Sequence, residues 1–289
     1  MDYIYLISCV GFSASTSILG GFYNKRNEGK KAASQLYTLI MIGSTFLFWL
    51  IRFCLNFELE LSVVWYALLF ALSYWSCNMA LIHALKVGPI ILTSLLMQLS
   101  LIGVTLWGFF FWNTKFTFLI GMGLALVCIS LVLCLYNGKD NEGLGISWKW
   151  IVYAGIAFIG NAGCAIVQRT QQISFEGHYG DFLMVIATGI ALLSSLIVYL
   201  RSDKTDSIQI IKKTWYIPVA AGVCNGLLNL FVIFLSISSI SPSLIYPTLA
   251  IGGLMLTTIF SAFVFKEKMR WWQWIGVFVG IIAVGLLSV

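Results

Sequence analysis

Apolar residues run almost continuously along this chain in ten stretches, and short polar segments separate them. A helix needs about 20 apolar residues to cross the hydrocarbon core of a bilayer, and the stretches are of this length. They show no alternation of apolar and polar positions, so they predict helices rather than the strands of a barrel. The predicted helices span residues 3–24, 33–55, 62–85, 89–112, 117–136, 148–172, 182–201, 215–238, 242–265 and 271–288.

Composition supports this prediction of an all-α integral membrane protein with ten transmembrane helices. Hydrophobic residues make up 60% of the 289 positions and charged residues 10%, and the mean hydropathy is +0.94. A soluble domain is closer to a quarter charged. The 7 cysteines all fall inside apolar runs without CxxC spacing, so we interpret them as packing residues rather than metal ligands.

Basic residues fall mainly in alternate loops, which predicts the orientation of the chain. If the loop after the first helix is inside, only Arg52, Lys115 and Arg169 of the 17 Lys and Arg residues lie outside. We therefore predict a multi-pass protein of the cell membrane with both termini outside. The net charge of +6 comes from these loops and indicates a solvated inner face, with no nucleic-acid partner.

The ten predicted helices divide into two halves of five, residues 1–137 and 148–289, joined by a linker at 138–147 that is rich in Gly and charge. An odd number of helices per half makes any repeat an inverted one, a layout that places a substrate site near the midplane. Setting Pro89 on Pro242 aligns the last two helices of each half without a gap.

Four motifs carry a resemblance to a known family: ALKVGPIILTSL from Ala84, SPSLIYPTL from Ser241, FVFKEK from Phe263 and the glycine-rich GVFVGIIAVG from Gly276. They resemble the drug/metabolite transporter superfamily, in particular its EamA-type members, which have ten helices in two repeats. The resemblance implies that the first, third and fourth helices of each half surround a central cavity, leaving the second and fifth outside it.

Two departures from the family pattern stand out. Family members commonly have a proline in the fourth helix of each repeat and a Gly-Glu turn after it. The second half approximates this with Pro247 and Lys266-Glu267, whereas the first half has Ser94 and Asn113-Thr114. Many members also keep both termini in the cytoplasm, whereas the charge distribution here predicts termini outside.

Polar side chains form stripes on several predicted helices, at spacings that place them on one helix face. Asn225 and Asn229 are four residues apart, and Asn161 and Gln168 are seven apart. Amides both donate and accept hydrogen bonds, so these stripes predict contacts with a polar solute. Hydrogen bonding between helices is the alternative interpretation. The candidate substrate-binding residues are Tyr74, Asn78, Ser94, Gln98, Asn161, Gln168, Asn225, Asn229 and Tyr246.

Proline and glycine mark two further features of the last two helices. Pro247 interrupts the helix at 242–265 and predicts a hinge, with an ordinary packing kink as the alternative. Gly276 and Gly280 form GxxxG, which predicts close helix packing within the monomer or across a homodimer.

Several kinds of chemistry are missing from the sequence. None of the 11 carboxylates lies near the centre of a predicted span, which disfavours carboxylate-driven proton antiport. There is no HExxH, GxSxG or Walker A motif, so we predict neither an enzyme nor a cofactor.

We therefore predict a secondary transporter, in the exporting direction by family habit, for a small polar metabolite such as an amino acid. It works by alternating access between the two inverted repeats, and its partners are the small-molecule substrate and the lipid bilayer. The alternatives are a multidrug or organic-cation efflux protein, a facilitator without coupling, and a structural or sensory membrane protein.

Overall fold

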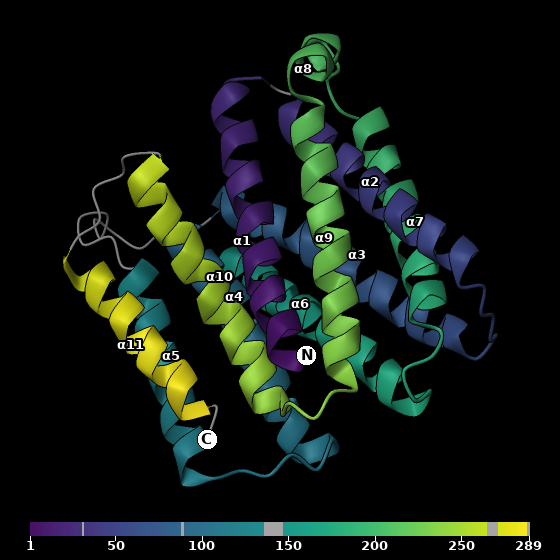
Figure 1. Ribbon diagram of the computed structural model, residues 1–289. Coiled ribbons are helices and arrows are strands. Elements are labelled where there is room, and N and C mark those ends of the chain that lie inside the picture. The colour runs from purple at the N-terminus through teal and green to yellow at the C-terminus, as the bar shows by residue number, and fades with distance from the viewer. Residues whose placement is uncertain (31, 88–89, 136–146, 265–270, 288–289) are drawn as a thin grey trace. The chain divides into compact units, whose positions relative to one another are not determined.

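The computed structural model describes residues 1–30, 32–87, 90–135, 147–264 and 271–287, and all regular secondary structure in these segments is helical. Figure 1 shows the arrangement along the chain. The helices are α1 (Asp2–Arg26), α2 (Ala33–Leu55), α3 (Val63–Val87), α4 (Ile90–Phe111), α5 (Phe118–Leu135), α6 (Trp148–Ser174), α7 (Gly180–Leu200), α8 (Ser207–Thr214), α9 (Tyr216–Ser236), α10 (Pro242–Val264) and α11 (Trp271–Leu287).

Each predicted segment is helical in the structure, and the described ends lie within two residues of the prediction. Six helices are long and apolar enough to cross a membrane: α1, α2, α3 over Val63–Leu81, α6, α7 and α9. These helices suggest a membrane protein. The described apolar parts of α4, α5, α10 and α11 are shorter, so ten membrane crossings stay a prediction. The short α8 lies where the sequence predicted only a loop, and that part of the prediction was wrong.

The chain forms two compact units, and each is described by itself. Unit 1 comprises Tyr3–Ala71 and Gln168–Ile237, and unit 2 comprises Leu72–Val167 and Ser238–Val289. Each unit therefore takes helices from both of the predicted halves, and α3 and α6 contribute to both units. The predicted halves are defined by a repeat in the sequence, whereas the compact units are defined by contacts in space. The inverted repeat stays a prediction, and most of the predicted linker 138–147 lies outside the described residues.

In unit 1, α2 packs against α7 and α9, and small residues allow close contact. A Cβ atom on Gly222 of α9 would stand 2.4 Å from the Met41 carbonyl oxygen of α2. The Thr45 hydroxyl donates across the same contact to the Gly222 carbonyl, at 2.9 Å. Such contacts between small residues and hydroxyl groups are typical of helices that associate in lipid, where burial of apolar surface adds little.

In unit 2, α5 packs along α11 and α4 along α10. The GxxxG glycines take part in this packing: Ser130 of α5 donates to the Gly276 carbonyl at 2.5 Å. A Cβ atom on Gly280 would lie within 3 Å of Ser130, Ile251 and Met255. The close packing predicted for GxxxG is therefore present within one chain. The homodimer stays a prediction.

The contact at Gly222 gives a test of the packing in unit 1. We expect Gly222→Ala to lower the free energy of unfolding by about 1–3 kcal/mol, because the added methyl group forces α2 and α9 apart. Gly11→Ala is the matched control on α1, since within the described residues no atom beyond its own stretch of helix lies within 4 Å of the added Cβ. In that position alanine is expected to be neutral or stabilising by up to about 1 kcal/mol. Thermal unfolding of both purified variants in detergent measures the difference; equal stability would contradict the close α2–α9 contact.

Candidate functional site

The structure distributes the predicted substrate-binding residues over both units. Gln168, Asn225 and Asn229 belong to unit 1, and the remaining candidates belong to unit 2. The backbone of Ser94 lies in α4, but its side chain lies outside the described residues, as do Pro89 and Lys266-Glu267 of the family motifs.

In unit 2, Asn161 links α6 to α4. Its Nδ2 atom donates to Ser100 Oγ at 2.6 Å and to the Met97 carbonyl at 3.3 Å. Asn78 Nδ2 donates within α3 to the Tyr74 carbonyl at 2.8 Å. The known contacts of these two amides are therefore those of helix packing. Gln98, on the turn of α4 that Asn161 contacts, is half-buried.

The remaining candidates of unit 2 lie on α10. Tyr246 is buried, and its ring centroid is 6.5 Å from that of Trp112. Pro247 is also buried, and α10 continues as an α-helix through it. Proline has no N–H to donate to the Ser243 carbonyl one turn earlier, so one backbone hydrogen bond is missing at that turn. The hinge at Pro247 stays a prediction.

In unit 1, three glutamines on the last turns of α6 are buried: Gln168 is 3% exposed, and Gln171 and Gln172 are fully buried. Gln172 Nε2 donates to Gln171 Oε1 at 2.6 Å, and Gln171 Nε2 donates to the His178 carbonyl at 2.9 Å. Gln172 Oε1 has no hydrogen-bond partner in the described part of the chain. A buried amide oxygen without a partner is costly and marks a position where a donor would be favourable.

Gln168 lies one turn before this cluster on α6 and contacts α9. Its Nε2 atom lies 3.5 Å from the Asn229 carbonyl and 3.9 Å from Met184 Sδ. Asn229 Nδ2 in turn donates to the backbone carbonyl of Asn225 at 2.9 Å and to its Oδ1 at 3.3 Å. Both asparagines are half-buried. The structure therefore brings together three of the predicted residues. With Gln171 and Gln172, one turn further along α6, they place five amides on neighbouring turns of α6 and α9, and we call these five the amide track.

A cavity of about 190 Å³ lies in unit 1 next to this track. Arg52, at the end of α2, binds Asp181 in the first turn of α7 through two hydrogen bonds of 3.0 and 3.1 Å. A carboxylate is also favourable at the N-terminus of a helix. The lining residues are Arg52, Asn56, Glu58, Gly177, His178, Tyr179, Gly180, Asp181, Phe182, Leu230, Ile233 and Phe234.

The rim of the cavity carries a second acidic group, Glu58. Its Oε2 atom accepts a hydrogen bond of 3.2 Å from the Tyr179 N–H, and its Oε1 atom is 3.4 Å from His178 Nδ1. Tyr179 has a φ of 61°, a left-handed conformation that non-glycine residues seldom adopt. Glu60 lies in the loop between α2 and α3 that also holds Glu58. Hydrogen bonds from Ser62 hold the pKa of the Glu60 carboxyl below its ordinary value.

Gly180 joins the cavity to the glutamine cluster. It lines the cavity, and a Cβ atom on it would stand 2.8 Å from Gln172 Nε2. The sequence did not single out Gln171, Arg52, Asp181, Glu58 or His178 as site residues. The available signal was the charge distribution: Arg52 is one of the three basic residues that it predicts outside, and Asp181 and Glu58 lie near helix ends on the same predicted side. We define the track and the cavity together as the unit 1 polar site.

No family model and no curated protein matches this chain. The fold is nevertheless shared: a solved structure, described only as the crystal structure of a protein, aligns with 99% of this chain and 96% of its own. The TM-score is 0.75 and the sequence identity 11%. At this identity the likeness shows the fold alone and carries no function.

The Arg52–Asp181 pair gives a test of the cavity. We expect Asp181→Asn to lower the free energy of unfolding by about 1–3 kcal/mol, because it removes a charge-assisted pair that is partly shielded from water. Arg52→Gln and the double variant complete a thermodynamic cycle, with an expected coupling of about 1 kcal/mol. Thermal unfolding of the four proteins measures it. Strictly additive effects would show that the two side chains do not interact.

Proposed function

We propose that this chain is a secondary transporter of the EamA type, which moves a small polar or zwitterionic metabolite across a membrane without changing it chemically. One observation carries the proposal: five amide side chains lie on neighbouring turns of the apolar helices α6 and α9 in unit 1, where Gln168 Nε2 meets the backbone carbonyl of Asn229. Polar groups inside apolar helices are costly, so their accumulation favours a functional role over simple packing.

The cavity supports the choice of substrate class. Arg52 presents a cation and Asp181 and Glu58 present anions around a volume of about 190 Å³. A zwitterion such as an amino acid carries both signs of charge and complements such a lining. The amide track beyond it offers donors and acceptors without a net charge, which suits a polar solute that has left water.

Alternating access between two inverted repeats is the proposed mechanism, and ten membrane crossings are its structural requirement. Direct proton antiport through a buried carboxylate is not part of the proposal. Arg52, Asp181 and Glu58 all lie at the ends of helices or in loops, where they serve recognition rather than proton exchange in the hydrocarbon.

The first experiment is a thermal-stability screen of the purified protein against amino acids, nucleosides, sugars, amines and organic cations. A ligand that binds the folded state raises its apparent stability. We expect a hit among the amino acids or their relatives. Hits restricted to apolar organic cations would replace this proposal with multidrug efflux.

The amide track is tested by flux of that hit into proteoliposomes. We expect Asn225→Ala and Asn229→Ala each to reduce flux roughly tenfold, the equivalent of one lost hydrogen bond to the substrate. Ser194→Ala on α7 is the control, because the Ser194 hydroxyl donates to the Ala191 carbonyl within α7. If folded yield falls in step with flux, the two asparagines serve packing instead.

Orientation is tested separately with a reporter that fluoresces only in the cytoplasm. With both termini outside, a fusion at the C-terminus stays dark, whereas an insertion in the loop between α7 and α8 is bright. This loop holds Arg201 and Lys204, which the charge distribution places inside. The reverse pattern would overturn the predicted orientation.

A further inference from the structure

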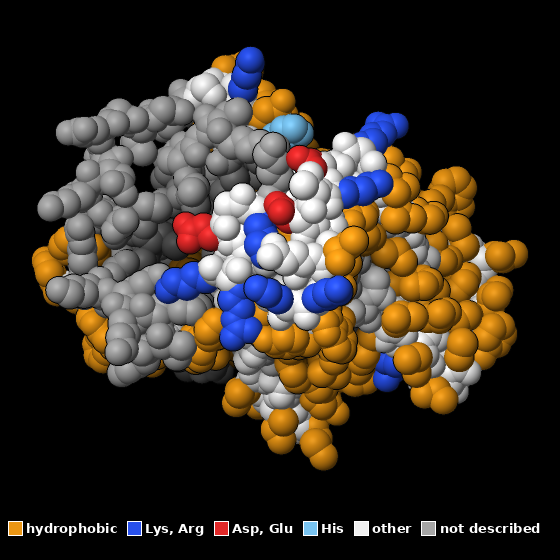
Figure 2. All heavy atoms as spheres, turned by 90° about the horizontal axis from the view of Figure 1, so that it is seen from above, with side chains coloured by type: hydrophobic (Ala, Val, Ile, Leu, Met, Phe, Trp, Pro, Cys, Tyr) orange, Lys and Arg blue, Asp and Glu red, His pale blue; other side chains and the backbone are white. Residues whose placement is uncertain are grey.

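Many Lys and Arg side chains lie on the face seen in Figure 2, which looks from above at the top of Figure 1, where α8 is labelled. Within unit 1 the exposed basic residues of this face come from the end of α1, the loop after α7, and α8. They are Lys25, Arg26, Arg201, Lys204, Lys212 and Lys213, and we call them the basic surface. The exposed acidic residues of the same segments are Glu28 and Asp203, so positive charge is in excess.

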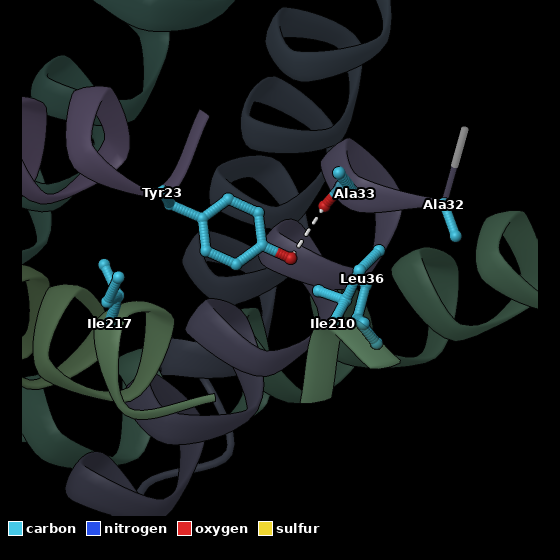
Figure 3. Packing of buried hydrophobic residues seen from close by; sticks show 6 residues of the cluster. All are labelled: Tyr23, Ala32, Ala33, Leu36, Ile210 and Ile217. Atoms are coloured by element: carbon cyan, nitrogen blue, oxygen red, sulfur yellow. Dashed lines mark hydrogen bonds between the residues drawn. The ribbon is translucent and has the colours of Figure 1, made fainter. Parts of the chain in front are cut away.

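Buried contacts hold the parts of the basic surface together. Tyr23 of α1 packs in one cluster with Ile210 of α8 and Ile217 of α9, all less than 4% exposed. The Tyr23 hydroxyl donates to the Ala33 carbonyl at 3.1 Å, and Figure 3 shows this bond among the cluster residues. Tyr199, next to the loop after α7, packs on the same cluster. The surface is therefore supported by a core rather than by loops alone.

Two polar contacts add to this support. Asn27 is buried, and its Nδ2 atom donates to the Tyr23 carbonyl and to Thr214 Oγ1, at 3.0 and 3.1 Å. Lys204 Nζ lies 5.8 Å from the centroid of the Tyr199 ring. The end of α1, α8 and the loop between α7 and α8 thus share one scaffold.

The exposed side of α8 combines charge with apolar groups. Ile208 is 72% exposed and Ile211 41%, next to the exposed Lys212 and Lys213. Trp215, at the junction with α9, is exposed as well. Aliphatic and aromatic side chains beside lysines are typical of surfaces that lie at the boundary between lipid headgroups and acyl chains.

We propose that the basic surface binds the phosphate headgroups of anionic phospholipids in the adjacent leaflet. The charge excess complements the phosphates, and Ile208, Ile211 and Trp215 enter the boundary region. The core at Tyr23 and Ile210 holds the segments that carry the basic residues in place before lipid binds. Lysines and arginines close to a membrane surface each add to the attraction for anionic lipid. The proposal concerns a lipid surface and is independent of transport through the unit 1 polar site.

The test measures the thermal midpoint of the purified full chain in detergent micelles that contain phosphatidylglycerol or, for comparison, phosphatidylcholine. We expect phosphatidylglycerol to raise the midpoint above the phosphatidylcholine value, and high salt to remove most of the difference, because screening weakens exposed charge interactions. In the K212Q/K213Q variant the stabilisation falls to roughly two thirds or less, since two of the six cations are gone.

The control is K115E, which changes the net charge by the same two units at an exposed position of unit 2 and leaves the stabilisation intact. Equal stabilisation of K212Q/K213Q and wild type, or stabilisation that high salt does not reduce, would overturn the proposal. So would an equal effect of inorganic phosphate added to phosphatidylcholine micelles, because the site would then recognise free phosphate. Both lysines are exposed, so the variant is expected to fold; native mass spectrometry of retained lipid gives a second reading that does not depend on its stability.

Discussion

Hydrocarbon offers no hydrogen-bond partner to a backbone amide, and the organisation of this chain depends on that constraint. Helices satisfy their own backbone groups, which explains why the described chain is helical wherever its structure is regular. Side-chain hydroxyls then donate a second hydrogen bond to backbone carbonyls that already accept one within their own helix. Thr45 does so across the α2–α9 contact and Ser130 across the α5–α11 contact. Both contacts occur where a glycine allows the helices to approach.

The same constraint makes the buried polar side chains of the unit 1 polar site costly. Gln171 and Gln172 are fully buried, yet they are held mainly by one another and by the His178 carbonyl. Packing alone would be served as well by apolar side chains, which bring no desolvation cost. The position of the cluster beside Gly180, at the wall of a cavity with charges of both signs, adds support to the proposed recognition of a polar solute.

The helical segments followed from the sequence because long apolar runs depend on local composition. The short α8 did not, since it is polar and is stabilised by the burial of Ile210 against Tyr23, a contact between residues far apart in the chain. The polar stripes predicted Gln168, Asn225 and Asn229 as site residues, but they did not predict the contact between Gln168 and α9. Nor could spacing reveal the pair of Arg52 and Asp181, because 129 residues separate the two side chains and only tertiary packing brings them together.

The assembly of each compact unit from distant segments has a consequence for biosynthesis. Unit 1 joins Tyr3–Ala71 to Gln168–Ile237. When α2 leaves the ribosome, the helices against which it packs, α7 and α9, have not yet been made. Domains usually fold as units as the chain emerges. Here α2 must instead wait for most of the chain, so cellular insertion and quality-control machinery has to hold an incomplete unit until α9 arrives.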